Sequence, residues 1–300
     1  MEEGRTCASA FGMELKLNDE GDPESPLFAA LAGRRIDLIG ASAAHPRQVI
    51  ASSARNVAAS IKVVLDALDD LPTLWVKGHN IDSKTLREGY RRLIYDATEL
   101  FDVYSQVIPD KFQKHGASRT AVADYRRVAK RLRDPWALMC NKFKHAGSRI
   151  AFSTATSSLG PAHSHGYIIL SPRDGTSMLR DEQIHKPPER RTTFTKSLHQ
   201  LLHAILRIDW NAAKLAATTL DGSVSPQPDT PLAFPFGEAI KRLRAMPVYV
   251  AAERATYDAV TLPANGIVRL VHSKGIPLVG VLHFSAQFEG DGHSTTFSFS

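Results

Sequence analysis

Between residues 46 and 147 apolar side chains recur at intervals of three and four, the spacing that places them on one face of an α-helix. The pattern runs over residues 46–71, 86–104 and from about residue 118 onward, after a shorter helical segment at 26–32. Its clearest members are Leu86, Tyr90, Leu93, Ile94, Ala97, Leu100, Phe101 and Tyr104. Amphipathic helices of this length bury their apolar faces against one another, so the pattern predicts a helical bundle over residues 26–147.

Helix ends within this region are marked by residues with known positional preferences. Ser83 suits the N-cap of the helix that follows it, and Pro109 and Gly116 are expected to end that helix. Asp134 and Pro135 suit an N-cap and a first helical position, so the last helix either kinks there or stops and a new helix begins. Gly147 is a natural C-terminal stop.

The pattern changes after Gly147. Residues 149–156 and 166–170 predict two paired strands, residues 172–175 a turn, and residues 193–219 a long amphipathic helix. A Pro-rich loop is expected at 223–235. The remaining candidate strands are residues 248–251, 267–272, 278–284 and 295–299.

These elements predict an α+β chain in which an N-terminal helical bundle precedes a mixed α+β region with a small antiparallel sheet. The second region spans residues 148–300. Residues 1–25 are acidic and irregular, and we expect them to form a mobile or loosely docked arm.

Basic residues are concentrated in one part of the chain. Residues 111–149 contain eleven Lys and Arg side chains against two acidic ones, while the whole chain has a net charge of +6. Such an excess attracts polyanions, and nucleic acid is the first candidate. The alternative is a solvated helix face whose acidic partners come from elsewhere in the fold.

Other features narrow the class of protein. Cys7 and Cys140 are too far apart in sequence for a zinc ribbon or a disulfide framework, and they fit the reducing cytoplasm. No run of about 18 apolar residues predicts a membrane span. Neither a phosphate-binding Gly loop nor a GxSxG elbow occurs, so we expect no nucleotide hydrolase, no α/β-hydrolase and no cofactor.

The predicted helix before Gly147 ends in a polar cluster: Asn141, Lys142, Lys144 and His145. Asn141 and His145 are four residues apart and share a face of the helix. An amide and an imidazole flanked by two ammonium groups could hold a phosphate. The alternative is that Asn141 and His145 brace the helix against the strand that follows.

This cluster resembles the motif of the HEPN superfamily, small helical bundles found in ribonuclease toxins and in defence systems against phage. The family motif is an Arg, four to six intervening residues and a His, commonly with a polar residue directly after the Arg. Asn141 and His145 match the polar position and the His, whereas Cys140 stands where the family has its Arg. The resemblance covers residues 48–147 and implies a metal-independent endoribonuclease of a toxin or defence system, acting as a homodimer.

Under this hypothesis His145 is the general acid or base, and Asn141 and Lys144 assist it as catalytic residues. The residues expected to bind nucleic acid are Lys142, Arg126, Arg127, Lys130 and Arg133. The alternative is a non-catalytic interaction protein whose basic helical face binds nucleic acid or an acidic partner protein.

Histidines elsewhere in the chain also invite a metal hypothesis. His199 and His203 are spaced as in HExxH zinc sites, but Gln200 stands where such enzymes have their catalytic Glu. His163, His165 and His185 lie near predicted turns without a carboxylate or Cys at a suitable spacing. We therefore expect a buried histidine pair, surface histidines and no metal site.

Overall fold

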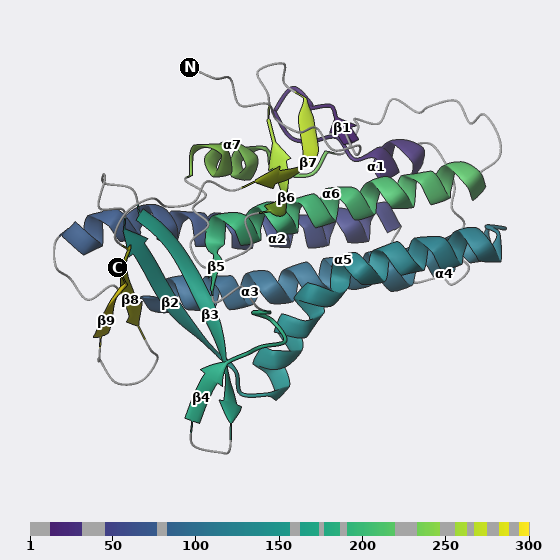
Figure 1. The fold of residues 1–300 in the computed structure, drawn as a ribbon. Coiled ribbons are helices and arrows are strands. Elements are labelled where there is room, and N and C mark those ends of the chain that lie inside the picture. Colours follow the sequence, from purple (N-terminus) through teal and green to yellow (C-terminus); the bar gives the residue numbers. More distant parts are fainter. Residues whose placement is uncertain are drawn as a thin grey trace.

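The computed structural model describes residues 13–31, 46–76, 83–156, 163–173, 177–186, 191–219, 233–246, 256–262, 267–274, 282–287 and 294–299. The long helices form a bundle around a shared core, and two antiparallel sheets lie against it (Figure 1). The long helices are α2 (Pro46–Val76), α3 (Ser83–Asp102), α5 (Arg119–His145) and α6 (Phe194–Thr219), and the shorter ones include α1 (Pro26–Leu31) and α7 (Gly237–Ala245). The predicted α+β class, with helices first and a small antiparallel sheet later in the chain, is confirmed.

The helix predicted from Ser83 continues past Pro109, where the sequence predicted its end. A π-helical turn (Val103–Val107) joins α3 to α4 (Ile108–Lys114), and the amide of Ile108 donates to the carbonyl of Val103. The wider turn shifts the hydrogen-bond ladder by one residue, so the missing amide proton of Pro109 does not break the helix. The run ends before Gly116, which has a φ of 94°.

Helix α5 is continuous through Pro135 and bends along its length (Figure 1). It starts after Ser118, whose side chain accepts a hydrogen bond from the amide of Ala121 at 3.1 Å. Asp134 is therefore not an N-cap. Its carboxylate instead accepts a hydrogen bond from Lys130 at 2.9 Å, one turn earlier in the helix. Gly147, at a φ of 61°, follows the end of the helix as predicted.

The larger sheet has the strand order β4-β3-β2-β8-β9, and β5 also pairs with β3. Its strands are β2 (Arg149–Thr156), β3 (His163–Arg173), β4 (Ser177–Arg180), β5 (Thr192–Thr193), β8 (Leu282–Gln287) and β9 (Ser294–Phe299). The smaller sheet has the order β1-β7-β6 and packs against α6 through β6. Its strands are β1 (Met13–Leu15), β6 (Thr256–Thr261) and β7 (Val268–Lys274).

Most of the expected strands coincide with observed ones. The pair over 149–156 and 166–170 is present, with β3 starting earlier, at His163. The candidates at 267–272, 278–284 and 295–299 overlap β7, β8 and β9. The candidate strand at 248–251 and most of the Pro-rich loop at 223–235 lie outside the described residues.

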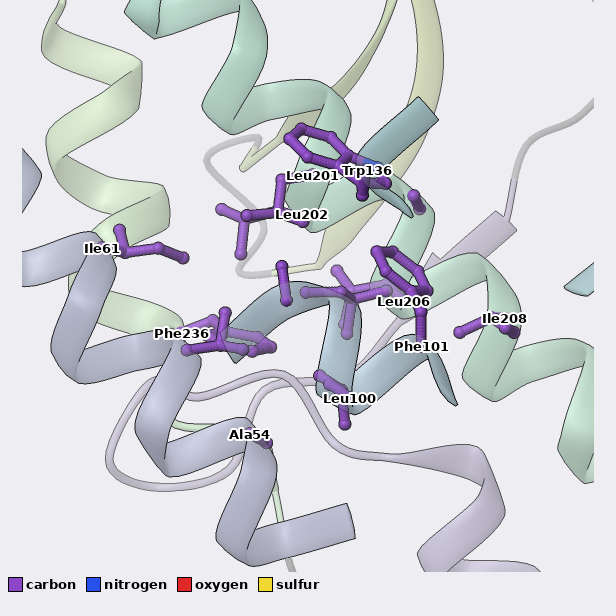
Figure 2. Packing of buried hydrophobic residues seen from close by; sticks show 14 of the residues in the cluster. Ala54, Ile61, Leu100, Phe101, Trp136, Leu201, Leu202, Leu206, Ile208 and Phe236 are labelled. Carbon is purple, nitrogen blue, oxygen red and sulfur yellow. The ribbon is translucent and has the colours of Figure 1, made fainter. Parts of the chain in front are cut away.

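One continuous hydrophobic core is built from residues that precede Gly147 in the chain and residues that follow it. Ile61 of α2, Phe101 of α3, Trp136 of α5 and Leu202 of α6 belong to the same buried cluster (Figure 2). Helix α6 is thus part of the helical bundle although it follows strands β2 and β3 in the chain. The helical bundle at 26–147 is completed by a helix from the region expected to be its accessory.

Residues 13–25, the part of the expected N-terminal arm that the structure describes, are docked on the rest of the chain. Strand β1 pairs with β7, and Leu15 is buried. The hydroxyl of Ser25 bonds to both carboxylate oxygens of Asp209 on α6, at 3.0 and 2.9 Å. Tyr104 donates to the same carboxylate at 2.7 Å. Burial raises the pKa of Asp209 to about 6, although these hydrogen bonds lower it.

Candidate nucleic-acid interface

The polar cluster predicted at the end of α5 divides between the surface and the interior. Asn141, Lys144 and His145 are exposed at the helix end, whereas Lys142 is half-buried. Lys142 Nζ lies 2.8 Å from Oδ2 of Asp181, and the side chain of Asp181 is only 2% exposed. The positive charge of Lys142 is therefore paired with a buried carboxylate of the protein itself.

Asp181 organises the turn between β4 and β5. Its carboxylate accepts hydrogen bonds from the hydroxyl of Ser171 at 2.5 Å and from the amides of Gln183 and Ile184 at 2.9 and 3.2 Å. Burial raises the pKa of Asp181, but the bonds from Lys142, Ser171 and Ile184 outweigh it and hold the pKa below its usual range. Lys142 thus stabilises the turn at residues 181–186.

The three proposed catalytic side chains are all exposed at the end of α5. Lys144 Nζ lies 5.1 Å from the centre of the Tyr95 ring on α3, a cation–π contact. His145 makes no hydrogen bond or ion pair with any residue in the part of the chain that the structure describes. Asn141 is likewise exposed. None of the three lines the cleft beside α5 that is described below.

The basic residues earlier in α5 have acidic neighbours. Their ion pairs are Arg126–Asp110 at 2.6 Å, Arg127–Asp124 at 2.6 Å, Lys130–Asp134 at 2.9 Å and Arg133–Asp102 at 2.5 Å. All but the last join strongly exposed side chains, and such pairs contribute only about 0–1 kcal/mol. An anionic ligand could therefore exchange with these carboxylates at small cost.

A cleft of about 590 Å³ opens beside the bend of α5. Its walls come from α5, from β3 and β5, from the turn at 181–186 and from α6; we call it the α5 cleft. The basic residues that line it are Arg127, Lys130, Arg131 and Lys186, and Asp134 is the acidic one. Arg131 and Lys186 are exposed and make no ion pair with any described residue.

Apolar and aromatic side chains form another part of the same cleft. Trp136 and Met139 come from α5, Tyr167 from β3 and Ile184 from the turn. A cleft that combines cations with aromatic and apolar walls suits a ligand with a planar apolar part and an anionic part.

Ser197 of α6 lines the α5 cleft and joins two tyrosine hydroxyl groups. Its oxygen lies 2.8 Å from the hydroxyl of Tyr90 and 3.2 Å from that of Tyr167. Burial, together with the neighbouring Tyr167, raises the pKa of Tyr90 well above its usual value, so its hydroxyl stays protonated. This network fixes the side of the cleft that lies against the core.

A glycine allows β5 to reach the cleft. Gly166 of β3 pairs with Thr193, and Thr192 lines the cleft. A Cβ atom at residue 166 would lie 2.7 Å from the carbonyl oxygen of Thr192, closer than such atoms approach. The absence of a side chain at Gly166 therefore allows β5 to pack close enough to β3 to form this wall of the cleft.

The α5 cleft unites some of the predicted residues and omits others. Arg127 and Lys130 line it, whereas Arg126, Arg133, Lys142 and the three catalytic candidates do not. The residues that sequence reasoning missed are Arg131, Trp136, Tyr167, Lys186, Ser197 and Gln200. The signal for Arg131 was its spacing from Arg127 and Lys130 along one helix face. Trp136 lies on α5 itself but belonged to its apolar stripe, and no local pattern linked Tyr167, Lys186, Ser197 and Gln200 to α5.

The histidines on α6 face the smaller sheet. His199 and His203 are buried, and burial lowers the pKa of each to about 4. A hydrogen bond with the backbone of Val260 raises the pKa of His199, and the charge of Asp258 raises that of His203, but burial outweighs both. His272 Nδ1 lies 3.1 Å from Asp258. Within the described residues no group of three or more His, Cys, Asp or Glu could hold a metal ion.

Comparison of the chain with protein-family models, curated proteins and solved structures gave no significant match. Across the described ranges, no helix combines the length and the apolar character needed to cross a bilayer.

Proposed function

We propose that this protein binds RNA along the side of α5 that lines the α5 cleft, as a non-catalytic nucleic-acid-binding protein. One observation carries the proposal: four basic side chains gather at a single cleft that also has aromatic walls. Phosphates bind Lys and Arg side chains, and unpaired bases pack on aromatic and apolar side chains. The choice of RNA over DNA rests on the resemblance to the HEPN superfamily.

The placement of the other candidates favours binding over catalysis. Lys142, which could have stabilised charge at phosphorus, is paired with the buried Asp181. Lys144 lies over the ring of Tyr95, and His145 is exposed outside the cleft. None of these three side chains lines the α5 cleft, where the four basic residues gather.

The test is the affinity for a fluorescein-labelled single-stranded RNA of about 20 nucleotides, measured by anisotropy over a range of salt concentrations. The logarithm of the binding constant should fall linearly with the logarithm of salt, with a slope of about −0.7 for each phosphate contacted. Lys130→Glu should weaken binding severalfold and reduce the slope.

Arg126→Glu is a matched control. Arg126 is on the same helix and is also paired with an aspartate, but it does not line the α5 cleft. We expect a smaller loss of affinity than for Lys130→Glu. Equal losses in both variants would mean that the charge of the helix as a whole is responsible, and absence of binding would reject the proposed function.

A further inference from the structure

We infer that the α5 cleft holds one unpaired nucleotide, with its base among Trp136, Tyr167 and Ile184 and its phosphate beside Lys130 and Arg131. This inference rests on the proposed function and names the form of nucleic acid that the cleft accepts. It predicts a preference for single strands, because a base within a duplex is stacked and paired and cannot enter a cavity.

The dimensions of the cleft suit one nucleotide. Its volume of about 590 Å³ falls within the range of roughly 300–1,000 Å³ that is typical of small-ligand sites. The cleft is also formed by elements that other interactions hold in place: the Ser197 network with Tyr90 and Tyr167, and the Asp181 turn held by Lys142. A pre-formed cleft limits the ordering that a bound base requires.

The distribution of chemistry along the cleft matches the two ends of a nucleotide. Lys130 and Arg131 lie on the solvent-exposed side of α5, where a phosphate linked to neighbouring nucleotides remains accessible. Trp136 and Tyr167 are buried, with only 5% and 2% of their surface exposed. A planar base seated over these two rings would cover the apolar surface that the half-buried Leu138 and Ile184 leave open, while its phosphate stays at the rim.

Gln200 supplies a group that can bind the polar edge of a base. It lies on α6, one helical turn after Ser197, and is half-buried in the wall of the cleft. Its amide makes no hydrogen bond to any residue in the described part of the chain. A side-chain amide can both donate and accept, as hydrogen bonds to a base edge require.

The experiment compares three probes on the full chain: a labelled 12-nucleotide single-stranded RNA, the same strand annealed to its complement, and uridine monophosphate. Gln200→Leu keeps the size of the side chain and removes its hydrogen bonds. Ile184→Trp fills the cavity from the half-buried wall formed by the turn at residues 181–186 and serves as a second, independent variant. Circular dichroism and thermal unfolding check that each variant folds.

We expect the single strand to bind at least about tenfold more tightly than the duplex, and we expect Gln200→Leu and Ile184→Trp to remove most of that preference. Lys130→Glu should weaken both forms. If single strand and duplex bind equally and neither cleft variant changes this, the inference is overturned while the proposed function stands.

Binding of uridine monophosphate separates the remaining cases. If the RNA strands fail to bind but the mononucleotide binds and is lost in Gln200→Leu, the proposed function fails and the cleft is a site for free nucleotides. If none of the three probes binds, both the inference and the proposed function are rejected.

Discussion

Lys142 Nζ on α5 lies 2.8 Å from Oδ2 of Asp181, a carboxylate that also holds the amides of the following turn. A cation that the sequence presents as a phosphate ligand is thus part of the support for one wall of the α5 cleft. The relationship links the end of α5 to the turn at residues 181–186, about forty positions later in the chain.

Replacing Lys142 by Met should leave the buried Asp181 charge without its partner. We expect a loss of about 2–3 kcal/mol in the free energy of unfolding, measured by urea denaturation, because removing one member of a buried pair exposes the cost of burying the other. Lys144→Met is the control: Lys144 is exposed and loses only its contact with the Tyr95 ring, so stability should change by no more than about 1 kcal/mol. Equal effects in the two variants would contradict this role for Lys142.

The same pair should depend on pH in a defined direction. The pKa of Asp181 is lowered in the folded state, so its contribution is fully present above the usual carboxyl pKa and is lost as the pH falls through the lowered value. In the Lys142→Met variant this part of the acid dependence should shrink, as urea denaturation at pH 5 and pH 3 would measure. An unchanged difference between the two pH values would argue against the assignment.

His199 and His203 should make the fold sensitive to mild acid. Their pKa values of about 4 lie below the usual 6.5, so the unfolded chain takes up protons between pH 6.5 and 4 that the folded chain does not. Each should cost roughly 2 kcal/mol between pH 7 and pH 5. Asp209, with a pKa of about 6, opposes them by roughly 1 kcal/mol, because the folded state binds its proton first.

Two variants separate these opposing contributions. His199→Phe should flatten the fall in stability between pH 7 and pH 5, and Asp209→Asn should steepen it, as urea denaturation at the two pH values would show. If both variants retain the slope of the wild type, the titrating groups lie elsewhere.

Gly166→Ala should displace β5, the strand whose Thr192 lines the α5 cleft. The added Cβ would meet the carbonyl oxygen of Thr192 at 2.7 Å, and backbone atoms yield less readily than a flexible side chain. We expect a cost of about 1–3 kcal/mol in thermal or urea unfolding and weaker RNA binding at temperatures where the variant is folded. Wild-type stability in Gly166→Ala would show that β5 can shift without cost.

His145→Ala should leave RNA binding within about twofold and stability within about 0.5 kcal/mol, because the side chain is exposed and lies outside the cleft. Expression of the wild type and the variant in one host should give total RNA of equal integrity. Cleavage by the wild type that disappears in His145→Ala would instead support the ribonuclease hypothesis drawn from the HEPN resemblance.

Local patterns made the helices predictable. The repeat around Phe101 and the Gly147 stop depend on residues that are close in sequence, and both appear in the structure. The sequence did not predict whether α5 continues through Pro135, because the packing around a proline decides whether a helix continues past it. The docking of β1 on β7 depends on a partner more than 250 residues away.

Only part of the α5 cleft could be predicted from the sequence, because its other walls come from residues far from α5 in the chain. Arg127 and Lys130 stood out by their charge and spacing, but whether a cation is paired depends on the fold. Lys142 illustrates this, since its partner Asp181 follows a strand pair whose register no local signal gives. Gln200, an ordinary polar residue on an amphipathic helix, gains its significance only from the cavity beside it.

Mapping the residues that contact bound RNA is a direct test of whether RNA binds in the α5 cleft. RNA carrying 4-thiouridine can be cross-linked to the protein by ultraviolet light, and the modified peptides can be identified by mass spectrometry. We predict cross-links within residues 135–139, at Tyr167 or in the turn at residues 181–186, and their loss in Ile184→Trp. Cross-links confined to residues 141–149, around His145, would contradict it.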